Sequence, residues 1–117
     1  MLFRSGSKDS YGPRETFDAD VVSAAELWPR FDFAKIDAEG AEADILCTMT
    51  EEQARKIDVM CEVRDQKNKL RIWKHFNSIG IPMWSQTIGW RMATSPLDLP
   101  ASAKEGSLFI GMETPFR

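Results

Sequence analysis

One stretch in the first half of the chain constrains the fold more than any other. Residues 31–36 are short, bounded and mostly apolar, which is typical of a strand buried on both faces. The stretch runs into an acidic turn at residues 37–40 (Asp-Ala-Glu-Gly), and residues 41–49 then have the composition of a helix. A buried strand that passes through a tight turn into a helix opens a βαβ unit. The sequence therefore predicts an α/β domain.

The rest of the chain continues this alternation. We expect strands at residues 16–22, 31–36, 57–63, 81–84, 90–93 and 107–113, and helices at residues 24–28, 41–49, 50–56 and 66–79. Ser23 suits the N-cap of the first helix, and Thr50 with Gln53 forms a capping-box pattern for the third. Strand–helix alternation followed by closely spaced strands predicts a sheet that is parallel first and antiparallel at the end. Residues 1–15 are polar enough to predict a flexible arm, which leaves residues 16–117 for the domain.

Composition and charge exclude several classes of function. The chain has 15 Lys and Arg against 18 Asp and Glu, a net charge of -3, so it lacks the basic face of a nucleic-acid binder. It has no apolar window long enough for a membrane span, and its start lacks the apolar run of a signal peptide. Cys47 and Cys61 are too far apart for a zinc site and suit buried thiols in a reducing compartment. These features predict a cytoplasmic protein that binds neither nucleic acid nor membranes.

Residues 32–42 read Asp-Phe-Ala-Lys-Ile-Asp-Ala-Glu-Gly-Ala-Glu and are followed by Ile45 and Leu46. This stretch closely resembles the signature of FkbM-type S-adenosylmethionine-dependent methyltransferases, in which a strand ending Lys-Ile-Asp-x-Glu-Gly-x-Glu leads into a helix. The next strand of that family ends in Glu, which Glu62 matches here. The resemblance covers residues 16–113 and is specific over residues 32–63.

The resemblance implies a partial Rossmann-like methyltransferase fold. The family's sheet has the strand order 3-2-1-4-5-7-6 with helices on both faces, and this chain would supply strands 4, 5, 7 and 6. Strands 1 to 3, with the glycine-rich turn that approaches the cofactor, would be missing, and the sequence contains no Gly-x-Gly series. Two interpretations stay open: a truncated reading frame of an enzyme, or a trimmed relative that has lost the activity.

The resemblance also implies where the chemistry lies. Ligands of open α/β sheets bind at the carboxyl ends of the strands, where Asp37 and Glu39 are expected. As catalytic residues they would orient an acceptor hydroxyl or take its proton, while Glu62, Trp84 and Trp90 would line the substrate cleft. The implied cofactor is S-adenosylmethionine, and the implied acceptor is a hydroxyl of a sugar or small molecule. No metal is expected.

Each of these residues also has a structural alternative. Asp37 or Glu39 would equally suit a cap of the helix that follows the strand. Glu42 is expected to be a solvated or capping acid, and His75 an exposed helix residue. Trp73 is expected to pack in the core. A magnesium site built from Asp37, Glu39 and Glu62 has no further ligand motif to support it.

The second candidate function is a binding role. Without a strand 1, the strand at residues 31–36 would leave its backbone N–H and C=O groups unpaired along one edge. Such an edge favours pairing with another chain. The sequence therefore also predicts a non-catalytic half-domain that forms homo-oligomers through this edge.

Overall fold

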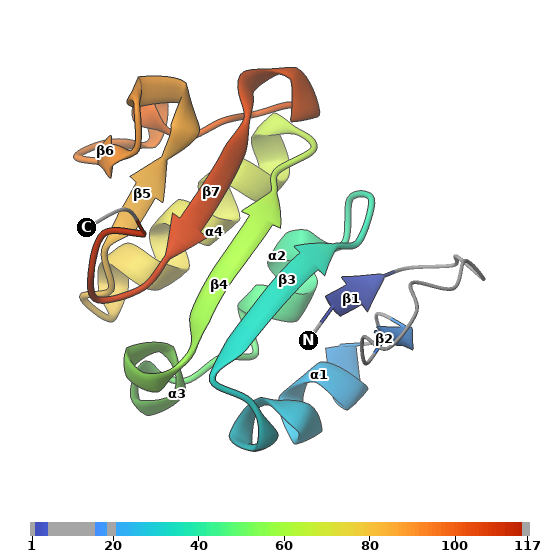
Figure 1. The fold of residues 1–117 in the computed structure, drawn as a ribbon. Helices are drawn as coiled ribbons and strands as arrows, with labels where there is room; N and C mark the ends of the chain where they lie inside the picture. The colour runs from blue at the N-terminus through green and yellow to red at the C-terminus, as the bar shows by residue number, and fades with distance from the viewer. Residues whose placement is uncertain (1, 5–15, 19–20, 116–117) are drawn as a thin grey trace.

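The structure is a computed structural model that describes residues 2–4, 16–18 and 21–115, with side chains from residue 24 onward. Seven strands form one sheet in the order β2-β1-β3-β4-β7-β5-β6 (Figure 1). The strands are β1 (Leu2–Arg4), β2 (Thr16–Asp18), β3 (Phe33–Asp37), β4 (Asp58–Glu62), β5 (Met83–Ser85), β6 (Arg91–Met92) and β7 (Ser107–Ile110). The helices are α1 (Val21–Leu27), α2 (Glu42–Leu46), α3 (Glu51–Lys56) and α4 (Gln66–Ser78). Short 3-10 turns complete the described chain at η1 (Trp28–Arg30), η2 (Gln86–Ile88), η3 (Pro96–Asp98) and η4 (Ala103–Glu105).

The sheet is mixed, as the sequence predicts. Strands β2, β1, β3 and β4 pair in parallel, whereas β7 pairs antiparallel with both β4 and β5, and β6 pairs antiparallel with β5. The late strands therefore return beside β4 as antiparallel neighbours. This part of the α/β prediction is confirmed.

Only one face of the central strands is covered in the described structure. Ala34 and Ile36 of β3 are fully buried, while Phe33 and Lys35, which alternate with them along the strand, are exposed. The strand β4 shows the same alternation, with Val59 buried and Asp58 exposed. Helices α2 and α4 lie behind β3, β4 and β7 in Figure 1, and no described helix crosses the near side of these strands. The prediction of helices on both faces is therefore wrong for the part of the chain that the structure describes.

The direction of the crossovers explains this one-sided arrangement. The chain leaves β3, passes through α2 and α3, and reaches β4 as the next strand in the sheet. It then leaves β4, passes through α4, and reaches β5 further along in the same direction. Parallel crossovers are almost always right-handed, so two crossovers that move in the same direction place their helices on the same face.

The N-terminal region departs from its predicted role. Leu2–Arg4 forms β1 and pairs in parallel with β3, with Leu2 beside Lys35 and Arg4 beside Asp37. The predicted exposed edge of the strand at residues 31–36 is thus wrong, because β1 occupies that edge. A three-residue strand is too short for a period-2 pattern to reveal it. The remainder of the predicted arm, residues 5–15, lies outside the described residues.

The first helix also differs from its prediction. The described part of β2 ends at Asp18, and α1 already begins at Val21. Ser23 therefore lies inside α1, and its predicted N-cap role is wrong. Helix α1 leads into η1, where the fully buried Trp28 donates its indole N–H to the Thr48 hydroxyl at 2.8 Å.

The later helices follow their sequence signals closely. In α3, the Thr50 hydroxyl accepts the Gln53 N–H at 3.2 Å and the Gln53 side chain accepts the Thr50 N–H at 3.1 Å, which confirms the capping box. Gly80 follows α4 with φ of +73°, as a glycine C-cap requires.

Two side chains of α4 can be compared with their expected places. His75 is half-buried rather than exposed, with its Nε2 2.8 Å from the Met49 carbonyl, and Trp73 packs against the core. None of the described helices has the length and apolar character needed to cross a membrane.

Candidate functional site

The carboxyl ends of β1 and β3 meet where the direction of chain progression across the sheet reverses. From β1 the chain goes on to β2 on one side, whereas the later strands β3 and β4 extend the sheet on the other side. Such a switch point, at the carboxyl ends of parallel strands, is where open α/β sheets bind their ligands. Asp37 is the last residue of β3 and lies beside Arg4 of β1 in the register. The predicted position of Asp37 at this end of the sheet is therefore confirmed.

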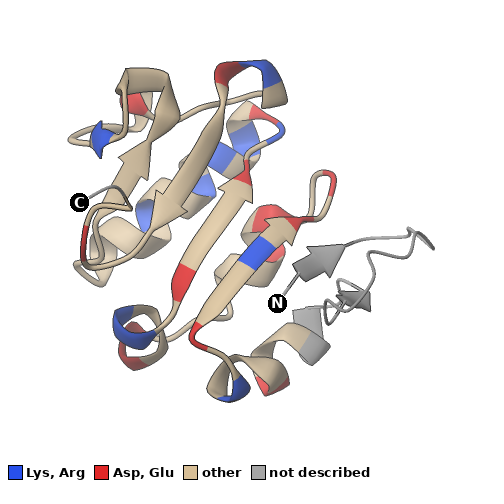
Figure 2. Ribbon diagram, in the orientation of Figure 1, with Lys and Arg blue, Asp and Glu red and all other residues tan. Residues whose placement is uncertain are grey.

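One guanidinium joins Asp37 to the end of the neighbouring strand. Arg64 Nη2 lies 3.3 Å from Asp37 Oδ1 and 3.2 Å from Glu62 Oε2. All three side chains are between 35% and 38% exposed, so solvent screens the pairs and each contributes about 0–1 kcal/mol. Two carboxylates share one cation, which leaves this cluster with a net charge of -1. Acidic positions lie at the carboxyl ends of β3 and β4, as the red segments of the ribbon show (Figure 2).

The turn after β3 carries Glu39 into solvent. Glu39 has a φ of +46°, which is uncommon for a residue other than glycine, and Gly40 follows with a φ of +104°. The Glu39 side chain is exposed and bonds to no described residue. A third carboxylate therefore stands at the same end of the sheet as Asp37 and Glu62.

The capping alternative for these acids is not what the structure shows. The N-cap of α2 is Ala41, and neither Asp37 nor Glu39 bonds to a backbone N–H of that helix. The Ala43 N–H instead donates to Asn68 Oδ1, at 2.9 Å, from the first turn of α4. Because Asn68 of α4 caps α2, the carboxylates of Asp37 and Glu39 do not cap this helix and lie at the surface of the site.

Asn68 holds the turn in place and was missed by the sequence analysis. Its amide also donates to the Gly40 carbonyl and to Asp65 Oδ1, each at 3.0 Å. Its bonds with Asp65 also lower the pKa of that carboxyl. A signal for this role does exist in the sequence, because Asn68 precedes Ile72 and Phe76 at steps of four on the buried stripe of α4.

Glu42 was expected to be a solvated or capping acid; it is fully buried, so it is not solvated, but it does accept a backbone N–H next to the start of α2. Its Oε1 accepts the Gly40 N–H at 2.8 Å, while its Oε2 has no described partner. Burial raises the pKa of this carboxyl, and the bond from Gly40 opposes the rise. Glu42 therefore stabilises the turn through the hydrogen bond that its Oε1 accepts from the Gly40 N–H.

The two tryptophans expected in the substrate cleft lie apart from the acidic cluster. Trp84 is on β5, which β7 separates from β4, and its indole N–H donates to the Gly111 carbonyl at 3.1 Å. Trp90 is half-buried in the turn between η2 and β6, with a φ of +63°. The structure thus brings Asp37 and Glu62 together and leaves Trp84 and Trp90 elsewhere.

The described residues contain no group of three or more His, Cys, Asp or Glu placed to hold a metal ion. Comparisons of the chain with family models, curated proteins and solved structures found no match.

Proposed function

We propose that this chain is an S-adenosylmethionine-dependent methyltransferase domain of the FkbM type, which methylates a hydroxyl of a sugar or small molecule. The observation that carries the proposal is the place of Asp37, at the carboxyl end of β3 beside β1, within reach of Glu62 through Arg64. This is the switch-point position at which an α/β sheet presents ligands. The residues that carry the family resemblance, 32–42 and Glu62, are the ones that build this end of the sheet.

The strand order supports the finer fold assignment within this proposal. The family's strands 4, 5, 7 and 6 would correspond to β3, β4, β7 and β5, which lie side by side in that order. The strand β7 is also antiparallel to both of its neighbours, as strand 7 is in that fold. On this assignment, β1 and β2 occupy positions beside strand 4 that other strands fill in the complete family fold.

The charges of the site suit a cationic methyl donor. S-Adenosylmethionine supplies a methyl group on a positively charged sulfur. The cluster of Asp37, Glu62 and Arg64 has a net charge of -1, and Glu39 adds a further negative charge beside it. These carboxylates would attract the sulfonium by charge, while Asn68 and Glu42 keep the turn that carries Glu39 rigid. We also propose a cytoplasmic location, since Cys47 and Cys61 are both free thiols.

Asp37 would perform the protein's part of the transfer. Only one of its oxygens contacts Arg64, so the other is free to accept the proton of an acceptor hydroxyl. S-Adenosylmethionine would supply the methyl group when bound, and Asp37 would accept the proton that the acceptor hydroxyl loses. Arg64 would hold the Asp37 carboxylate in a fixed direction. Alignment of this kind supplies much of the catalysis in an in-line displacement.

A non-catalytic role as an interaction module is the second candidate. The specific observation in its favour is the uncovered face of β3 and β4, on which Phe33 is 44% exposed. Sheets with parallel strands are normally covered on both faces. On this alternative the open face, rather than the predicted strand edge, would mediate homo-oligomerisation.

Calorimetric titration with S-adenosylmethionine, whose sulfur carries the positive charge that the carboxylates would attract, separates the two candidates. The enzyme proposal expects saturable binding that weakens at least about tenfold in Asp37→Ala, which corresponds to about 1.4 kcal/mol. Asp44→Ala is the matched control, because Asp44 is also a partly exposed carboxylate paired with an arginine, Arg71, but lies on α2 away from the strand ends. It should bind like the unaltered chain. A folded protein that gives no heat would refute cofactor binding by this chain and favour the interaction module.

A further inference from the structure

A cavity lies between the end of α4 and the strands β5 and β6. Its volume is about 410 Å³, near the lower end of the range for small-molecule sites. Its lining comes from three segments of the chain, namely the second half of α4, residues 80–83 and residues 92–94. The cavity is at the start of β5, whereas Asp37 is at the carboxyl end of β3, so the two sites are separate.

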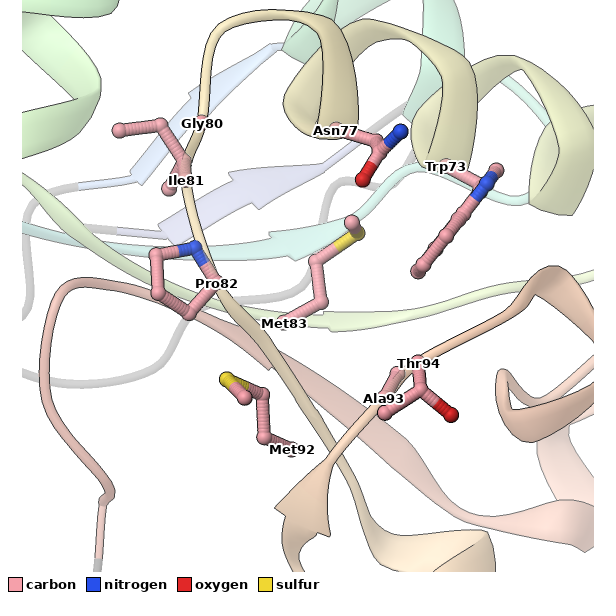
Figure 3. A pocket seen from close by; sticks show the side chains of 9 residues that line it. All are labelled: Trp73, Asn77, Gly80, Ile81, Pro82, Met83, Met92, Ala93 and Thr94. Atoms are coloured by element: carbon pink, nitrogen blue, oxygen red, sulfur yellow. The ribbon is translucent and has the colours of Figure 1, made fainter.

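Aromatic and thioether groups form the walls of this cavity. Trp73 and Asn77 are one helical turn apart on α4, so their side chains lie next to each other (Figure 3). Met83 faces them from β5 and is 2% exposed, while Met92 of β6 is 50% exposed. An indole ring offers a flat apolar surface, and methionine sulfur makes favourable contacts with aromatic rings. The walls therefore favour a planar aromatic ligand.

The polar groups of the cavity select a neutral ligand with a polar edge. No side chain of Asp, Glu, Lys, Arg or His is among the lining residues. The Thr94 hydroxyl lies 3.2 Å from Asp98 Oδ2 and is already bonded. The Asn77 side-chain amide, in contrast, bonds to no residue in the described ranges. Its oxygen points toward Met83 in Figure 3 and remains to accept a hydrogen bond from a ligand.

We infer that this cavity is a binding site for a neutral, planar heteroaromatic compound whose polar edge bonds to Asn77. A charged ligand would find no counter-ion in the lining, and an aliphatic one would forgo the contacts with the indole ring. Met92 closes the open side of the site and loses its own exposure to water when the ligand binds. The inference does not depend on methyl transfer, because it uses no residue of the acidic cluster.

Titration with indole, followed by NMR spectra of ¹⁵N-labelled protein, tests the site. We expect saturable shifts of the Trp73 indole N–H and of the amides of Met83, Ala93 and Thr94. Asn77→Ala should weaken the binding about three- to tenfold through the lost hydrogen bond. Met92→Asp, which places a charge at the mouth without disturbing the core, should weaken it at least about tenfold.

Leu97→Asp is the matched control, since Leu97 is 84% exposed on η3 and does not line the cavity. It should leave the affinity for indole unchanged. The inference is overturned if indole produces no saturable shift at these residues up to its solubility limit. It is also overturned if Met92→Asp binds indole as tightly as Leu97→Asp.

Discussion

Replacing Asn68 by alanine should destabilise the protein more than any other single change of a polar residue in α4. The substitution leaves the Ala43 N–H and the Gly40 carbonyl without the partners that they have at 2.9 and 3.0 Å. Ala43 is fully buried, so water has no access to its N–H, whereas the exposed Gly40 can bond to water. A buried backbone group left unsatisfied costs about 1–3 kcal/mol and the lost bond to Gly40 adds about 0.5–1.5 kcal/mol, which gives about 1.5–4.5 kcal/mol for the two. The melting temperature should fall by about 6–18 °C.

Urea unfolding of Asn68→Ala beside Asn77→Ala measures this cost. Asn77 is exposed on the same helix, and its side chain bonds to no residue in the described part of the chain. The control therefore carries the same gain in helix propensity, about 0.5–0.7 kcal/mol, without the lost bonds. The difference between the two free energies of unfolding should be about 1.5–4.5 kcal/mol at an unchanged m-value. If the two variants differ by less than about 1 kcal/mol, Asn68 does not hold the turn as described.

Three further changes test other parts of the structure. Because burial raises the Glu42 pKa, the folded protein holds that proton more tightly, so the free energy of unfolding should fall as pH rises above the ordinary value of 4.5. Glu42→Gln should flatten this fall in urea titrations at several pH values, and an unchanged slope would contradict the buried carboxyl. Thr50→Ala should cost about 1 kcal/mol in thermal unfolding, and Thr50→Ser much less, because only the serine keeps the cap. Half-exposed Cys47 should react with Ellman's reagent in the folded protein before the fully buried Cys61, whose pKa burial raises strongly; equal rates would contradict this.

The sequence predicted best where local patterns and tertiary packing agree. The capping box at Thr50, the strand β4 and the long helix α4 all have local signals, and the structure contains each of them. The mixed sheet followed from the spacing of these elements. The strand β1 had no such signal, because its three residues are too few to show an alternating pattern.

The candidate site was predicted in part. Asp37 and Glu62 could be placed together because the carboxyl ends of neighbouring parallel strands lie at one edge of a sheet. Glu42 could not be recognised as buried, since a carboxylate adjacent to a turn is ordinarily solvated. Trp84 was expected near these acids, but β7 returns between β4 and β5 and separates them. The strand order implied by the family resemblance already places the last strand between them, so Trp84 did not follow from that order.

Hydrogen exchange in the presence of S-adenosylmethionine tests the central claim most directly, because it reports where on the chain the compound binds. We predict slower exchange at the carboxyl ends of β3 and β4, in peptides that contain Asp37 to Gly40 and Glu62 to Asp65. At a ligand concentration near the dissociation constant, the same peptides should show much less slowing in Asp37→Ala, while Asp44→Ala retains it. Unchanged exchange in these peptides at saturating ligand, or slowing confined to other parts of the chain, would contradict the claim that Asp37 marks the cofactor site.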